Sequence, residues 1–478
     1  MADLTIITEP QQNKPQAAVP KKAKLDVFSG SLAVLSSNVG GGLVSMPWAF
    51  LKMGFPLATI VLVLFGVCSQ ISCFLLLEAR KRVGHSVQTM FEVAYVCAES
   101  WGVFYVCLTC LLQSVFVDIA LLVVFGETCA SIFKRQSELD HEWMQTRTPY
   151  ILGFGLFLTV PCLMKQIKEL KVVALSLFIS IFILIGLFLY LLHRFGREYS
   201  PDEQVNEYFG FTMSLDVFIA IGVVSTAQSF QTTLFPIQKD LMERSLDETL
   251  KVTNYGLILS SAIYLLVGVL AVLLFGSATH PSFLDDFGTL HSSVSYIVRC
   301  SFLLVIIFHF PYVFYPGKEA FLIVFDELRR GSMSKALKIS TERASASESD
   351  AEPLLERTTQ QSDASTASLK PYLELPVWLY SSLTLLLLAM QIVAAICIKD
   401  VTTAFAFAGA FCSSQIMFTM PGYFWHKTRA LKAKNINSPN EQWYCGWACV
   451  AQFFIYFGLV QLVFISVCEG LRLANNGD

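Results

Sequence analysis

The sequence is short of charge. Only 15% of its 478 residues are Asp, Glu, Lys or Arg, whereas soluble domains carry about 25%. Hydrophobic residues make up 54% of the chain and its mean hydropathy is +0.56. A chain of this composition cannot cover the surface of an ordinary soluble globule, so a soluble enzyme is excluded.

Other familiar signals are also missing. No loop holds a phosphate-binding glycine pattern or a paired Cys/His metal spacing, so we expect no enzyme activity and no cofactor or metal. The net charge of −3 comes with no basic face, so nucleic acid is not an expected partner. The 13 cysteines lie within or beside apolar runs, which argues against a disulfide framework. The polar N-terminus lacks the apolar core of a signal peptide, so insertion should begin at the first span.

Long apolar runs are what the sequence has in abundance. A helix needs about 20 apolar residues to cross a hydrocarbon core of roughly 30 Å. Such runs occupy residues 27–51, 53–77, 100–126, 148–164, 172–192, 217–238, 252–284, 300–317, 375–398, 401–425 and 442–468. We therefore predict an all-α polytopic membrane protein with about eleven transmembrane helices.

Charge and composition divide the chain further. Most of the 34 Lys and Arg residues lie in loops on the same side as the N-terminus, which the positive-inside rule places in the cytosol. Residues 88–100 should form an amphipathic helix leading into the third span. The predicted parts are a disordered cytosolic tail (1–26), spans one to eight (27–327), a disordered cytosolic loop (328–370), spans nine to eleven (371–470) and a short C-terminal tail (471–478).

The first span contains three consecutive glycines, Gly40, Gly41 and Gly42, two residues after Asn38. Each glycine destabilises a helix by roughly 1 kcal/mol relative to alanine. Backbone groups freed in mid-membrane must be packed in protein or line a cavity, and transporters build substrate sites at such breaks. The triplet therefore predicts a discontinuous helix at a substrate site. Close helix packing through small residues is the alternative.

Four motifs in a fixed order extend this interpretation over most of the chain. They are NVGGGLVSMPWA at 38–49, LFPIQKDL at 234–241, FPYVFYPGK at 310–318, and GAFCSS with FTMP at 409–414 and 418–421. With these motifs the sequence resembles the amino acid/auxin permease family. The resemblance implies a transporter with a LeuT-type inverted repeat, in which spans one and six are discontinuous and hold an amino acid.

The resemblance places the second break at residues 225–233. This run, STAQSFQTT, is polar but has no glycine. The expected substrate-binding residues are Asn38, Gly40, Gly41 and Gly42 at the first break and Ser229 and Gln231 at the second. The alternative for this run is a polar face that joins neighbouring helices.

Ionisable residues inside spans cost several kcal/mol near the bilayer centre and are functional candidates. Asp118 in the third span and His309 in the eighth are such residues. Where many sodium-coupled family members have an Asn in span one and a hydroxyl in span eight, this chain has Ser36 and His309. We therefore expect protons rather than sodium to be coupled, with Ser36, Asp118 and His309 as ion-coupling residues. The alternatives are a bond from His309 to a carbonyl freed by Pro311 and a structural partner for Asp118.

The function predicted from these features is secondary active transport of small, neutral amino acids by alternating access. The alternative is an amino acid sensor that keeps the site and signals through its cytosolic loop.

In that loop, Asp350 stands four residues before Leu354 and Leu355. The spacing fits an acidic dileucine sorting signal for clathrin adaptors and predicts an endosomal, lysosomal or vacuolar membrane. A chance leucine pair in a plasma-membrane protein is the alternative.

Overall fold

The computed structural model describes residues 25–475 apart from 84–86, 88, 137–142, 144–145, 165–169, 196–207, 211–212, 290–292, 333, 336, 339–374, 399–400 and 434–440. The described chain is almost wholly helical. Its main elements are α1 (Val27–Asn38), α2 (Gly41–Met53), α3 (Phe55–Val83), α4 (Met90–Gln136), α5 (Thr148–Leu163), α6 (Leu170–Phe195), α7 (Leu215–Ala227), α8 (Gln231–Asp240), α9 (Leu246–Phe275), η3 (Gly276–Ala278), α10 (Phe283–Thr289), α11 (Ser293–Arg330), α14 (Val377–Cys397), α15 (Val401–Phe407), η5 (Ala408–Thr419), α16 (Met420–Ala433) and α17 (Glu441–Asn475).

Every predicted span falls on one of these helices or on consecutive ones. Within the described residues, eight helical segments are long and apolar enough to cross a membrane, and α1 and α2 form one further span bent by 66°. Two shorter apolar helices, Thr148–Leu163 and Phe178–Arg194, coincide with the fourth and fifth predicted runs. The prediction of an all-α polytopic membrane protein is confirmed.

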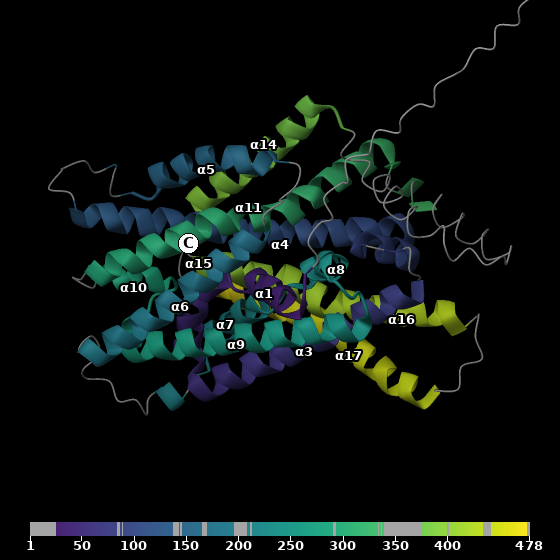
Figure 1. Ribbon diagram of the computed structural model, residues 1–478, viewed down its shortest axis with the longest axis horizontal. Coiled ribbons are helices and arrows are strands. Elements are labelled where there is room, and N and C mark those ends of the chain that lie inside the picture. The colour runs from purple at the N-terminus through teal and green to yellow at the C-terminus, as the bar shows by residue number, and fades with distance from the viewer. Residues whose placement is uncertain are drawn as a thin grey trace, which may run out of the picture.

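The helices form two packed groups (Figure 1). Helices α4, α5, α11 and α14 pack on one another, and we call them the scaffold group. The bundle group consists of α1 with α2, α3, α7 with α8, and α9. In Figure 1 the scaffold helices α5 and α14 lie along the upper edge and the bundle helices α3 and α9 lie lower down. Each group therefore combines helices from the first and second halves of the chain.

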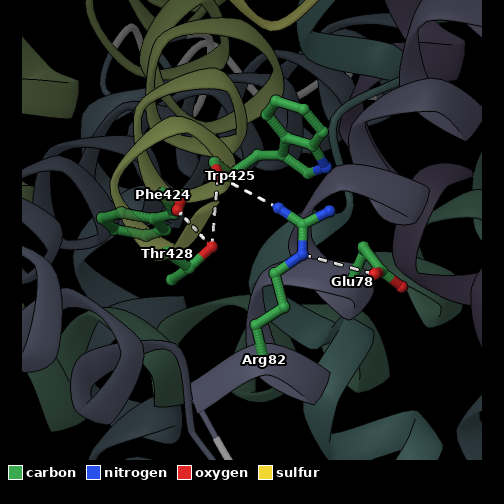
Figure 2. A network of polar contacts seen from close by, with 5 residues as sticks. All are labelled: Glu78, Arg82, Phe424, Trp425 and Thr428. Atoms are coloured by element: carbon green, nitrogen blue, oxygen red, sulfur yellow. Dashed lines mark hydrogen bonds and ion pairs between the residues drawn. The ribbon is translucent and has the colours of Figure 1, made fainter. Parts of the chain in front are cut away.

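Polar contacts at the end of α3 join the bundle group to α16 (Figure 2). Arg82 pairs with Glu78 at 3.3 Å and donates to the Trp425 carbonyl at 3.3 Å. Its guanidinium also lies 4.5 Å from the centre of the Trp425 ring. The Thr428 hydroxyl lies 2.8 Å from the Phe424 carbonyl. Since the Arg82 side chain is only 1% exposed, this ion pair is shielded from solvent and fixes how α3 meets α16.

Helix α4 contains both the predicted amphipathic helix and the third span. Thr89 caps its start by accepting from the Glu92 amide at 3.3 Å and donating to the Glu92 carboxylate at 3.0 Å. The two parts meet at a kink, where Glu99 has φ 51° and Ala98 has φ −150°. The sequence therefore predicted the helix, and the kink marks where it enters the span.

Span ten departs from a regular α-helix. Residues Ala408–Thr419 (η5) are wound as a π-helix between α15 and α16. A Cβ added at Gly409 would lie 2.2 Å from the Gly222 carbonyl oxygen. The glycine therefore lets the wider helix approach α7 directly, beside the break in span six.

Candidate substrate site

Both predicted helix breaks are present. In span one, α1 ends at Asn38 and α2 begins at Gly41. Between them Val39 is extended, with φ −86° and ψ 97°, and Gly40 has φ −149° and ψ −120°. In span six, α7 ends at Ala227 and α8 begins at Gln231, which leaves residues 228–230 outside both helices.

A cavity of about 80 Å³ lies at these two breaks. It is enclosed by the broken spans together with α4, α11 and α15. Its lining consists of Ser37, Asn38, Gly40, Gly42, Cys110, Gln113, Ser114, Val117, Thr226, Ala227, Ser229, Phe230, Thr232, Thr233, His309, Tyr312, Val313, Pro316 and Phe405. Asp, Glu, Lys and Arg are missing from this described lining, so the cavity combines polar and apolar groups without a fixed charge.

The break in span one is tight because His309 fills the space beside it. A Cβ added at Gly40 would lie 2.0 Å from His309 Nε2. The carbonyl of Asn38, at the end of α1, accepts a hydrogen bond of 2.5 Å from the Tyr264 hydroxyl on α9. Only glycine at position 40 leaves room for the imidazole here. The break in span one therefore packs directly against His309 of span eight.

The break in span six is held by side chains from α3 and α9. Ser69 donates to the Gln228 carbonyl at 2.8 Å and accepts from Gln231 Nε2 at 2.9 Å. Gln228 Nε2 lies 2.9 Å from the Ser261 hydroxyl. Carbonyl groups that an α-helix would satisfy are thus satisfied by neighbouring helices.

Three hydroxyl groups meet where the two breaks approach span eight. The Ser37 hydroxyl lies 2.7 Å from the Tyr312 hydroxyl, and Thr233 donates to Ser37 at 3.1 Å. These residues come from α1, α11 and α8. The cluster therefore ties both half-helices to the scaffold group at one end of the cavity.

Asp118 lies beside the cavity and is wholly buried. One of its oxygens, Oδ2, is within hydrogen-bond distance of the Ser114 hydroxyl at 3.0 Å and of Gln391 Nε2 at 2.9 Å. Ser114 also lies 2.8 Å from the Val313 carbonyl on α11. Ser114 lines the cavity, so the carboxyl is one hydroxyl away from it.

The structure brings most of the predicted residues together. Asn38, Gly40, Gly42, Ser229 and His309 line the cavity. The Ser36 hydroxyl instead bonds the Ala33 carbonyl within α1, and Gln231 turns towards Ser69.

Other predicted residues lie elsewhere. Gly41 starts α2, but its surroundings are outside what the structure describes. The sorting motif of Asp350, Leu354 and Leu355 also lies outside the described residues.

Sequence reasoning missed several lining residues. Gln113 and Ser114 come from the third span, and Tyr312 comes from the eighth. Gln113 and Ser114 lie one turn before Asp118, so the unusual Asp could have drawn attention to that face of the helix. In the described part of the chain, His, Cys, Asp and Glu form no cluster of three that could bind a metal.

Comparison with solved structures defines the class of protein. The transporter MhsT in complex with L-phenylalanine aligns with a TM-score of 0.55 at 13% identity, covering 96% of this chain and 100% of that one. The nucleobase-cation symporter Mhp1 aligns with a TM-score of 0.52 at 10% identity, covering 95% and 94%. The chain has the LeuT-type fold of membrane transporters.

Sequence comparison then defines the family. The family described as transmembrane amino acid transporter protein matches residues 23–468, so the chain belongs to it, the family of the amino acid/auxin permeases. Vacuolar amino acid transporter 5 of Saccharomyces cerevisiae is 24% identical over 84% of this chain and 88% of that protein. Amino acid transporter AVT6E of Arabidopsis thaliana is 22% identical over 83% and 74%. The family predicted from the sequence is confirmed. As a member of this family, the protein is a transporter and not an enzyme.

Proposed function

We propose that this protein is a secondary active transporter of small, neutral amino acids that works by alternating access and is driven by protons rather than sodium. The observation that carries the proposal is the cavity at the two helix breaks, whose lining combines polar and apolar groups without a fixed charge. The family supports amino acids as the substrate class.

The cavity favours a small zwitterion. Its volume of about 80 Å³ is several times the roughly 10–15 Å³ needed for one water, which leaves room for a ligand with about half a dozen heavy atoms. The N-termini of α2 and α8 adjoin the breaks, and helix N-termini favour a carboxylate. Carbonyl groups at the ends of α1 and α7 suit an ammonium group. A charged substrate side chain would find no counter-ion in the described lining.

Coupling to protons rather than to sodium is favoured because the titratable side chain of His309 occupies the place where sodium would otherwise be coordinated. His309 fills the space against Gly40 where unwound backbone would otherwise be free to coordinate sodium. Its Nδ1 is buried without a hydrogen-bond partner among the described residues. His309 and the buried Asp118 are the two candidate proton carriers.

The proposed location is a vacuolar or lysosomal membrane. Two relatives from Saccharomyces cerevisiae are named vacuolar amino acid transporters 5 and 6. The acidic dileucine motif would bind a clathrin adaptor, and an acidic lumen would supply protons for export of amino acids to the cytosol. Imaging a tagged Leu354→Ala/Leu355→Ala variant tests this. We expect it to move to the plasma membrane, and an unchanged distribution would show that the motif is idle.

The experiment that tests the transport proposal is uptake by purified protein in liposomes. Labelled glycine, alanine, serine, aspartate, lysine and phenylalanine are compared under an imposed proton gradient and under a sodium gradient. We expect the three small neutral amino acids to accumulate with the proton gradient in sodium-free buffer. Accumulation with sodium alone would refute the coupling, and failure of every amino acid would refute transport.

A further inference from the structure

The feature that carries a further inference is the hydrogen-bond chain around Asp118. A carboxylate in the middle of a span is costly unless it is paired with a charge or a metal. Among the described residues Asp118 has no ion pair, and its hydrogen-bond partners are Ser114 and Gln391. Its second oxygen, Oδ1, is buried without a partner in the described chain. The surroundings are therefore built for a neutral carboxylic acid.

The count of hydrogen atoms points the same way. A serine hydroxyl has one hydrogen to donate. Ser114 Oγ lies 3.0 Å from Asp118 Oδ2 and 2.8 Å from the Val313 carbonyl oxygen, and neither can donate if Asp118 is ionised. If Asp118 carries a proton, both contacts become hydrogen bonds, because the carboxylic acid donates to Ser114 and Ser114 donates to Val313.

We infer that Asp118 is the proton-binding group of the transport cycle and that the Ser114 hydroxyl relays its proton to the cavity. This inference rests on the proposed proton-coupled transport. Ser114 first turns its own hydrogen from the Val313 carbonyl to a water in the cavity, and it then accepts the Asp118 proton at Oγ while it releases that hydrogen to the water. Ser114 is then left as a neutral hydroxyl that donates to the new carboxylate, and the water carries the proton away.

The protonation state of Asp118 changes the hydrogen bonding in the cavity, because Ser114 and Val313 both line it. With Asp118 protonated, the Val313 carbonyl is occupied by Ser114. With Asp118 ionised, Ser114 turns to the carboxylate and no longer donates to the Val313 carbonyl, which regains an open lone pair on that side. A substrate ammonium group would bind that acceptor, so proton loss and substrate binding are linked through one hydroxyl.

The neighbouring groups leave this role to Asp118. Cys162 on α5 interacts electrostatically with it, and Lys318 on α11 is engaged with the carbonyls of Cys162 and Met164 at 2.9 and 2.7 Å. Helix α14 presents Gln391, and α15 is uncharged along its length. His309 and Tyr312 on α11 line the cavity, and among the described residues the Ser114 hydroxyl contacts Asp118 and Val313 rather than either of them. Gly317 packs closely against Ser114, since a Cβ added at Gly317 would lie 2.3 Å from Ser114 Oγ. This close packing holds the Ser114 hydroxyl in place for the relay.

The first test does not need transport. Infrared difference spectra of the purified wild-type protein are recorded as the pH is raised from neutral, and compared with those of Asp118→Asn. We expect a protonated-carboxyl band that the variant lacks and that Ser114→Ala shifts. If no such band belongs to Asp118 at neutral pH, the inference is wrong even if the protein transports amino acids.

The second test separates proton coupling from substrate movement in liposomes. Asp118→Asn should lose accumulation driven by a proton gradient while keeping exchange of internal for external amino acid. Asp247→Asn, on an exposed carboxylate, is the matched control and should keep both. Proton-driven accumulation by Asp118→Asn at the wild-type level would overturn the assignment. Failure of wild-type exchange would instead refute the proposed function.

Discussion

The two helix breaks are built in opposite ways. In span one the break coincides with a glycine triplet, and the missing side chain of Gly40 makes room for His309. In span six the residues between the half-helices are Gln228, Ser229 and Phe230. This break is held by a hydrogen bond from Ser69 to the Gln228 carbonyl and by one from the Gln228 side-chain amide to Ser261. Both breaks have hydrogen-bond partners on α9, but only the first is also marked by glycine in its own segment.

This contrast determines which helix breaks can be predicted from the local sequence. A helix in hydrocarbon stays intact unless its freed backbone groups find partners. Glycine lowers the helix's own stability, so it is visible in the local sequence. Donors on α3 and α9 are far away along the chain, so their effect on span six emerges only when the helices pack.

The largest effect is expected at the glycine-built break. In Gly40→Ala the new methyl group would meet His309 Nε2 at 2.0 Å and push the imidazole into the cavity. We expect uptake to fall on the order of 100-fold, as small misplacements at a reacting or binding site do. Initial uptake rates in liposomes check this. Gly153→Ala, where nothing lies within 4 Å of the added Cβ, is the matched control and should keep normal uptake.

A double variant sharpens the first prediction. Removing the imidazole in Gly40→Ala/His309→Ala restores the space, so substrate binding should recover relative to Gly40→Ala alone. Binding of the substrate to purified protein is the measurement. No recovery would show that Gly40 acts through its backbone rather than through the space it leaves for His309.

The break held by neighbours should respond to loss of a distant donor. Ser69→Ala removes the hydrogen bond to the Gln228 carbonyl and the acceptor for Gln231. Each buried group left unsatisfied costs about 1–3 kcal/mol, so the thermal denaturation midpoint should fall. Ser72→Ala on the same helix is the control, because the Ser72 hydroxyl is buried without a partner in the described chain. Equal midpoints for the two variants would contradict the account of span six.

A smaller effect is expected where the two breaks are joined. Tyr312→Phe removes the hydroxyl that lies 2.7 Å from Ser37 while keeping the ring. The loss of one hydrogen bond is worth about 1 kcal/mol, so kcat/KM should fall about fivefold. Steady-state uptake kinetics test it. Unchanged kinetics would mean that the hydroxyl cluster does not link the half-helices during transport.

The smallest effect on transport lies outside both breaks, at α10. Burial raises the pKa of the Asp286 carboxyl to about 7, although its hydrogen bonds and charge interaction with His280 lower it. The folded protein therefore binds this proton more tightly than the unfolded chain, so stability should fall as pH rises from about 4 to about 7. Asp286→Asn should weaken this dependence without changing substrate selectivity. A wild-type denaturation midpoint that is flat over this range would refute it.

Sequence patterns predicted the spans well because bilayer thickness acts on each helix separately. Apolar length sufficed for nine of the predicted runs, the other two fall on shorter apolar helices within the described residues, and glycine sufficed for the first break. The π-helix of span ten left no such local signal, since Gly409 matters only through its approach to Gly222.

The site was predicted less completely. Asn38 and Ser229 were found because they sit in the breaks, whereas Gln113 and Tyr312 reach the cavity only through the packing of the scaffold group. The Ser36 side chain does not line the cavity, because a step of one residue along a helix turns the side chain by about 100°. Its neighbour Ser37 faces the cavity instead.

The central claim is that the two breaks together form one amino acid site. The most direct measurement is a cryo-EM map of the purified protein with the best substrate from the uptake panel, compared with a map without it. We predict added density between Gly40 and Gly42 on one side and Gln228 to Phe230 on the other, with the carboxylate end towards the starts of α2 and α8. Saturating substrate with no density there, or density elsewhere in the protein, would contradict the account.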